Sequence, residues 1–171
     1  SERLPVKEDI YVVNPEEKVG KYGGTLTTTT LQPNGFGNDS LFTAFSNYVK
    51  PLTDGSGIVP EVAKNLEPSK DKKVWTLYLR KGLKWSDGND FDVEDVMFWY
   101  NDILLNKELT PIPNQGVRTK DGGVAEIEKV NNYQVKFIFP NPRPYFPNRL
   151  YLWHNLYPKH YLKQFHPNYV D

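Results

Sequence analysis

Residues 74–104 are VWTLYLRKGLKWSDGNDFDVEDVMFWYNDIL, and this stretch indicates the fold class more clearly than any other. Residues 74–80 alternate between two kinds of side chain, which is typical of a strand with one buried face. The buried side is predicted to hold Trp75, Leu77 and Leu79, and the outer side Thr76, Tyr78 and Arg80.

The rest of this stretch predicts a helix over residues 93–104, because its apolar residues recur at intervals of three and four. Asp92 stands at the N-cap position, and Asp95 follows three residues later, near the free amides of the first turn. Phe91 and Val96 occupy the two positions of a hydrophobic staple. These signals agree that the helix begins after Asp92.

Weaker patterns extend on both sides of this stretch. Residues 133–139 predict a second half-buried strand, and residues 84–86 a short strand before a turn. The threonine-rich residues 25–31 also favour a strand. Residues 40–48 have the spacing of a short helix that ends before Pro51. Strands and helices are intermixed, so we predict an α+β (mixed α/β) fold.

The composition excludes several classes of protein. The chain has 171 residues, no cysteine, and 21 basic against 21 acidic side chains, so its formal net charge is zero. A nucleic-acid-binding protein needs excess positive charge, and disulfide scaffolds, thiol catalysis and thiolate zinc sites need cysteine. No apolar run approaches the roughly 18 residues of a membrane-spanning helix. Residues 1–9 are charged and do not resemble a signal peptide, as in an exported protein after cleavage.

The densest group of acidic residues lies around the start of the predicted helix and consists of Asp87, Asp90, Asp92, Glu94 and Asp95. Converging carboxylates can bind calcium, but this spacing does not match an EF-hand loop. A pair of carboxylates could also catalyse glycoside hydrolysis, although nothing in the sequence selects two of them. We favour a turn at residues 87–88 followed by helix capping.

The histidines and aromatic residues raise two further alternatives. His154, His160 and His166 are spaced by six, which places them on different faces of a helix, so zinc binding would require the chain to fold back. The chain has 4 tryptophans, 11 tyrosines and 9 phenylalanines, and aromatic surfaces can bind sugars or peptides. Most of these aromatic residues fall at strand and helix spacings, which favours the core.

An ordered set of motifs runs from residue 57 to residue 100. Gly57 and Pro60 come first, and the strand that ends in Leu-Arg-Lys-Gly at residues 79–82 follows. Lys-Trp-Ser-Asp-Gly at residues 84–88 then precedes the helix with Asp-Val at residues 92–93. In this order and spacing the motifs resemble family 5 of the solute-binding proteins, the oligopeptide- and dipeptide-binding proteins of bacterial peptide-type ABC importers. The resemblance extends to residues 20–26, 127–137, 140–146 and 158–161, while Leu66 stands where tryptophan is common.

The resemblance implies part of lobe one of a two-lobed periplasmic-binding-protein-like fold. Family members run to several hundred residues, so we expect this chain to be an N-terminal fragment. Residues 1–37 would then be an N-terminal arm with the first strand of lobe one. Residues 38–171 would form the small mixed α/β subdomain of that lobe, and the second lobe would be absent.

The resemblance also implies a function, namely capture of oligopeptides, or of a similar solute such as an oligosaccharide, for the permease of an ABC importer. It implies a monomer without catalysis, cofactor or metal, placed outside the cytoplasm in a periplasm or on a lipid anchor. Ligand would lie in the cleft between the lobes, which the loop after the first strand would face. Gln32 and Asn34 could hydrogen-bond a peptide backbone or a sugar hydroxyl, and Phe36 completes the predicted ligand-binding set.

Two alternatives from other classes remain. The aromatic content and neutral charge would also suit a free-standing carbohydrate-binding or enzyme-accessory module. The carboxylates of residues 87–95 would suit a small hydrolase.

Overall fold

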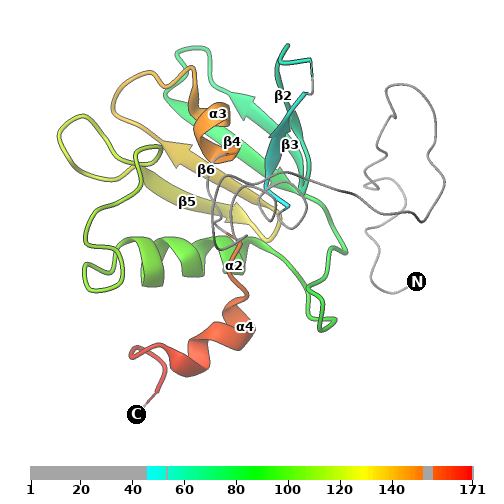
Figure 1. The fold of residues 1–171 in the computed structure, drawn as a ribbon, viewed down its shortest axis with the longest axis vertical. Coiled ribbons are helices and arrows are strands. Elements are labelled where there is room, and N and C mark those ends of the chain that lie inside the picture. The colour runs from blue at the N-terminus through cyan, green and yellow to red at the C-terminus, as the bar shows by residue number, and fades with distance from the viewer. Residues whose placement is uncertain (1–45, 53, 152–155, 171) are drawn as a thin grey trace, which may run out of the picture. The chain divides into compact units, whose positions relative to one another are not determined.

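The structure is a computed structural model that describes residues 46–52, 54–151 and 156–170. The residues from Asn47 onward belong to one compact unit. A four-stranded antiparallel sheet in the order β3-β4-β6-β5 is at its centre (Figure 1). Its strands are β3 (Ala63–Pro68), β4 (Val74–Leu79), β5 (Glu126–Asn131) and β6 (Gln134–Ile138). A second antiparallel sheet pairs β1 (Val49–Pro51) with β2 (Ile58–Pro60). The fold is therefore mixed α+β.

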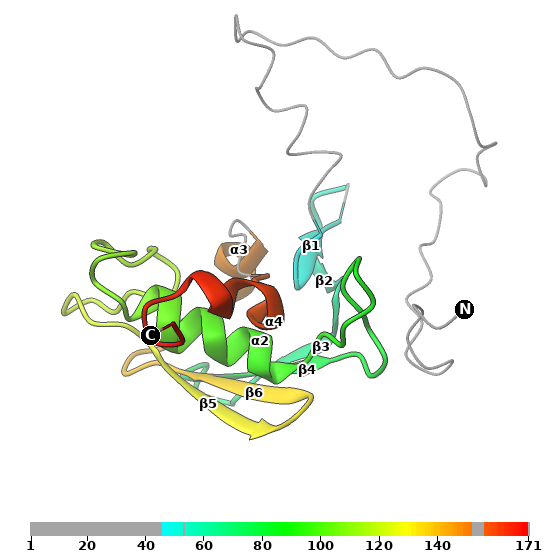
Figure 2. The same ribbon diagram turned by 90° about the horizontal axis from the view of Figure 1, so that it is seen from below.

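Helices lie on one side of the four-stranded sheet (Figure 2). They are α2 (Val93–Phe98), the π-helix η2 (Trp99–Leu104), α3 (Phe146–Tyr151), α4 (Lys159–Leu162) and the 3₁₀-helix η3 (Lys163–Phe165). Within the described ranges no helix is long and apolar enough to cross a bilayer.

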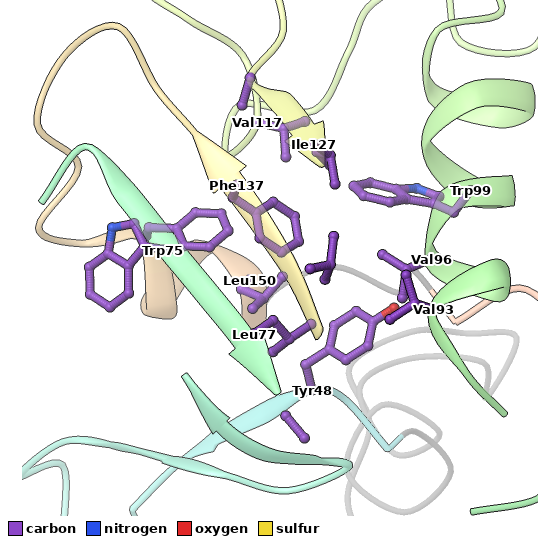
Figure 3. Packing of buried hydrophobic residues seen from close by; sticks show 14 of the residues in the cluster. Tyr48, Trp75, Leu77, Val93, Val96, Trp99, Val117, Ile127, Phe137 and Leu150 are labelled. Carbon is purple, nitrogen blue, oxygen red and sulfur yellow. The ribbon is translucent and has the colours of Figure 1, made fainter. Parts of the chain in front are cut away.

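The core lies between the inner face of the sheet and these helices (Figure 3). Alternate residues of β4 and β6 point inward and are buried, which follows from the two-residue repeat of a strand. Phe146 of α3 covers this face, and its ring centroid lies 5.0 Å from Phe137 and 5.9 Å from Trp75. Trp99 and Tyr48 are also buried in the same cluster.

The prediction of two half-buried strands at residues 74–80 and 133–139 is confirmed. Trp75, Leu77 and Leu79 are buried as expected. Arg80 was predicted on the exposed side, and this is wrong: it is 7% exposed. Its Nε donates a hydrogen bond to the main-chain oxygen of Glu61 at 3.1 Å, which compensates for the burial of the guanidinium.

The predicted helix over residues 93–104 is confirmed in extent and in its N-cap. The Asp92 side chain accepts a hydrogen bond from the amide of Glu94, and the Asp95 side chain accepts one from the amide of Asp92, which closes a capping box. The second half differs, because η2 is a π-helix. The amide of Leu105 accordingly donates to the oxygen of Tyr100, five residues earlier.

Two predicted elements are wrong where the structure describes them. Residues 84–86 form only an isolated bridge between Lys84 and Asp90, because the chain turns back at once through Gly88, whose φ is +93°. Residues 46–48, the end of the predicted helix over 40–48, are not helical. The oxygen of Tyr48 instead accepts hydrogen bonds from the amides of Glu61 and Ala63, and Pro51 ends a strand. The strand predicted at residues 25–31 lies outside the described residues.

Candidate functional site

The predicted ligand-binding residues Gln32, Asn34 and Phe36 lie outside the described residues, as does His154. The proposal that they face ligand stays a prediction. The other residues that the sequence singles out, the acidic segment 87–95 and two of the histidines, can be placed.

A contact between Asp87 and His160 joins a turn to α4. Asp87 Oδ2 lies 2.6 Å from His160 Nε2. The pKa of Asp87 falls to about 2, first because the amide of Asn89 donates a hydrogen bond to its carboxylate and second because His160 does. His160 therefore interacts with a carboxylate of the turn, and Trp85 packs against its ring with centroids 6.5 Å apart.

Glu94 links α2 to both β5 and α4. Its two carboxylate oxygens each accept a hydrogen bond at 2.7 Å, one from Lys129 Nζ and the other from Lys159 Nζ. These two donors lower the pKa of Glu94 to about 2. The contact holds α4 against the start of α2.

Asp95 is the buried member of the acidic segment, with 4% of its surface exposed. Its carboxylate accepts hydrogen bonds from Trp85 Nε1 at 3.1 Å, from the amide of Lys159 at 2.9 Å and from the amide of Asp92 at 3.2 Å. Burial nevertheless raises the pKa of Asp95 above its usual value. The turn and the helix cap in the acidic segment confirm the interpretation that the sequence favours. The contacts of Glu94 and Asp95 with Lys159 of α4 were not predicted. No group of three His, Asp or Glu residues in the described ranges could hold a metal ion.

A second buried carboxylate, Asp102, is one that the sequence analysis missed. Tyr169 Oη donates to Asp102 Oδ2 at 2.9 Å, and Asn168 Nδ2 donates to Oδ1 at 3.2 Å. The main-chain oxygen of Asp102 lies 2.9 Å from Nε2 of the buried His166. This polar cluster joins residues 166–169 to η2. Asp95 and Asp102 are seven residues apart and therefore lie on the same face of the predicted helix. This shared face was the signal from which a second inward-facing carboxylate could have been predicted.

The described residues also enclose a cleft of about 450 Å³ that is lined by positively charged side chains. The loop from η2 to β5 lines one part of it, and the loop from β6 to α3 together with α3 itself lines the other; both loops can be followed in Figure 1. The lining residues are Gln115, Arg118, Thr119, Lys120, Gly122, Arg143 and Arg149. The sequence does not predict this site, because its cations lie in two segments about 25 residues apart and no local motif joins them.

Most of the large aromatic residues belong to the core and not to a binding surface. Trp75 and Trp99 are each 6% exposed. Tyr145 is the main exception, because it is 75% exposed and lies in a smaller pocket of about 210 Å³ that shares Lys120, Arg143 and Arg149 with the cleft.

Comparison with known proteins identifies the class. Residues 57–170 match the model of the bacterial extracellular solute-binding proteins, family 5. The match covers most of the chain, so the chain belongs to this family of extracellular solute-binding proteins.

Individual relatives include binders of different solutes. The chain is 33% identical over 136 residues to the periplasmic alpha-galactoside-binding protein of Rhizobium meliloti (strain 1021), an alignment that covers 76% of this chain and 18% of the relative. It is 27% identical over 143 residues to the dipeptide-binding protein of Escherichia coli (strain K12), covering 67% of this chain and 25% of that protein.

The solved structures that resemble this chain are also solute-binding proteins. The oligopeptide-binding protein OppA superposes with a TM-score of 0.82 and 35% identity over 99% of this chain and 26% of that one. The periplasmic binding protein MelB from Agrobacterium fabrum C58, in complex with stachyose, gives a TM-score of 0.63 and 30% identity over 80% of this chain and 22% of that one. This chain thus spans about a quarter or less of the length of these relatives.

Proposed function

We propose that this protein captures oligopeptides outside the cytoplasm and delivers them to the permease of an ABC importer. The observation that supports this most directly is the 35% identity to the oligopeptide-binding protein OppA over 99% of the chain. Membership of the extracellular solute-binding proteins supports the location. A periplasmic or lipid-anchored monomer is the form that we propose.

The proposed mechanism is closure around the ligand without catalysis. Binding would shift an equilibrium between open and closed arrangements of two lobes, as expected when a ligand contacts one arrangement better than the other. The roles of the buried carboxylates favour this mechanism over hydrolysis. Asp95 and Asp102 both accept hydrogen bonds from neighbouring segments of this chain and so hold those segments in place.

Within this mechanism we propose that residues 38–171 form the mixed α/β subdomain of lobe one, and that residues 31–36 contribute to the ligand cleft. Asn34→Ala in the native protein is then expected to weaken peptide binding at least about tenfold, because a buried backbone partner would lose its hydrogen bond. Asn38→Ala is the matched control. Equal affinity of the Asn34→Ala variant and the unmodified protein would contradict the assignment of this loop.

A second candidate solute is an oligosaccharide, favoured by the 33% identity to the periplasmic alpha-galactoside-binding protein. Native protein, isolated from its source cell with an antibody against the 171-residue chain, distinguishes the two in a calorimetric titration. Micromolar binding of tri- to pentapeptides with no response to raffinose is the expected result. The reverse pattern would replace the peptide by a galactoside, and binding of neither solute would overturn both candidates.

A further inference from the structure

We propose that the cleft between the loop 115–122 and the side chains of Arg143, which precedes α3, and Arg149, which lies on α3, is a binding site for a small multivalent anion, one with several carboxylate or phosphate charges. This site is separate from the predicted ligand loop at residues 31–36, and the proposal does not depend on the solute that the protein transports. It rests on the shape of the cleft, its charge, and the way in which one of its arginines is held.

The cleft concentrates positive charge in a concave space. Three arginines and one lysine, namely Arg118, Arg143, Arg149 and Lys120, line about 450 Å³, and no acidic side chain lines it. The whole chain has a formal net charge of zero, so this concentration is local. Like charges held close together raise the free energy of the site, and an anion bound among them lowers it.

The chain itself does not neutralise these cations. In the described part of the chain, Arg118, Lys120 and Arg149 form no ion pair. The nearest acidic residue in sequence, Asp121, instead accepts a hydrogen bond from the Thr119 hydroxyl. By contrast, some lysines outside the cleft do form ion pairs with acidic side chains, as Lys84 does with Asp90. The charge of the cleft is therefore available to a ligand.

Arg143, which lines both the cleft and the neighbouring pocket, is already held in position. Its Nη2 donates to the main-chain oxygen of Arg118, which joins the two loops. Its main-chain amide donates a hydrogen bond to the main-chain oxygen of Lys72 at 2.8 Å, and its main-chain oxygen accepts one from Trp75 Nε1 at 3.1 Å. The guanidinium also lies 5.5 Å from the centre of the Phe139 ring. A guanidinium has five donors, so a side chain fixed in this way can still bind a carboxylate or phosphate with little loss of conformational entropy.

The neighbouring pocket indicates how much of a ligand could fit. It measures about 210 Å³, shares three of the four cations, and adds Pro142, Pro144 and Tyr145. An anion with an organic body can place its charges in the larger cleft and its body against these apolar side chains. A single carboxylate, such as the C-terminus of a peptide, would neutralise only one of four charges, which is why we infer a multivalent ligand.

The test is calorimetric titration of the 171-residue chain at low ionic strength with citrate, with inorganic pyrophosphate and with acetate. We expect citrate or pyrophosphate to bind with one site per chain, acetate to bind much more weakly, and added salt to weaken the binding. The variant Arg118→Gln/Arg149→Gln is expected to lose at least about tenfold in affinity, as the loss of two charged hydrogen-bond donors implies.

The matched control is Lys107→Gln/Lys163→Gln, which removes two exposed cations outside the cleft. It should bind as the unmodified chain does. If the arginine double variant fails to fold by circular dichroism, Lys120→Gln/Arg149→Gln replaces it, since both of these side chains are exposed. Equal losses in the cleft and control variants, or no binding of either multivalent anion, would each overturn the small-anion site.

Discussion

At the residue scale, Asp92 sets where the principal helix begins. Its carboxylate accepts a hydrogen bond of 2.7 Å from the amide of Glu94, and Asp95 closes the reciprocal half of the capping box. Replacing an N-cap Asp by Ala removes that acceptor and typically costs about 1 kcal/mol. We therefore expect Asp92→Ala to lower the free energy of unfolding by about that amount in urea denaturation. Glu108→Ala, at an exposed loop position, is the control and should change it little.

Glu94 gives a prediction about pH. Hydrogen bonds from Lys129 and Lys159 lower its pKa from 4.5 to about 2 in the folded chain. A lowered folded-state pKa stabilises the protein above the unfolded-state value and loses this effect as the pH falls toward 2. Its side chain is 46% exposed, and solvent screening reduces the gain, so Glu94→Gln is expected to cost about 1 kcal/mol at pH 7.

The measurement is urea denaturation of Glu94→Gln and of the unmodified chain between pH 7 and pH 2. The difference between them should shrink below about pH 4.5. Glu108→Gln, which alters a carboxylate in an exposed loop, provides the control and should show no such trend. A Glu94→Gln difference that stayed constant with pH would mean that the charge of Glu94 contributes no stability through the two lysine contacts.

At the element scale, the C-terminal segment is attached to the helical layer by polar contacts. Tyr169 Oη and Asn168 Nδ2 both donate to the carboxylate of the buried Asp102, and Phe98 packs against the rings of His166 and Tyr169. Burial and the Asp102 carboxylate raise the pKa of Tyr169, so its hydroxyl keeps the donated proton at neutral pH.

Tyr169→Phe removes this donor while it keeps the ring. A hydrogen bond to a charged acceptor contributes about 1.5–3 kcal/mol, and the partial exposure of Tyr169 favours the lower end of this range. We expect the variant to lose about 1.5 kcal/mol of unfolding free energy and to show faster amide exchange at residues 166–169. Tyr161→Phe is the matched control, because Tyr161 is 54% exposed on α4. Similar losses in both variants would contradict the assigned role of Asp102.

The elements differ in how far sequence could predict them. The strands β4 and β6 and the start of α2 follow from local patterns, namely two-residue alternation and a capping box, and the structure has them at the expected residues. The bridge between Lys84 and Asp90 is also local, because it spans the turn at Gly88. The burial of Arg80 and the contact of η2 with His166 depend instead on partners far away in sequence. The cationic cleft is of this second kind, since Arg143 and Arg118 meet only through the tertiary fold.

At the scale of the whole molecule, the charges are segregated even though they sum to zero. Asp87, Glu94 and Asp95 all interact with residues of the segment 159–160, so these three carboxylates have hydrogen-bond partners within the fold. The cations of the cleft form no ion pair among the described residues. Because the three acidic side chains are bound within the fold and the cations of the cleft are not paired with acids in the described part of the chain, we assign a structural role to the acidic segment and infer a ligand for the cationic cleft.

The buried cluster is continuous from β1 through the four-stranded sheet to α3, so the described unit should unfold in one cooperative step. Phe137 lies at its centre, fully buried, with ring contacts to Phe146 of α3. Phe137→Ala would leave a cavity and is expected to cost about 3–5 kcal/mol, a large part of a typical domain's stability. Val130→Ala in β5, where the side chain is 46% exposed, is the control with little expected change.

Thermal unfolding followed by tryptophan fluorescence and by far-ultraviolet circular dichroism tests both points. The two signals should have one midpoint in the unmodified chain, and that midpoint should fall far more in Phe137→Ala than in Val130→Ala. If Phe137→Ala does not fold, Phe137→Leu keeps most of the apolar volume, and the smaller decrease that it should cause remains measurable. Tryptophan fluorescence reports on all four tryptophans of the chain, among them Trp75 and Trp99 on opposite sides of the core, whereas circular dichroism reports on the backbone. Separate midpoints would show that the unit does not unfold in one step, and the single cooperative core would then be wrong.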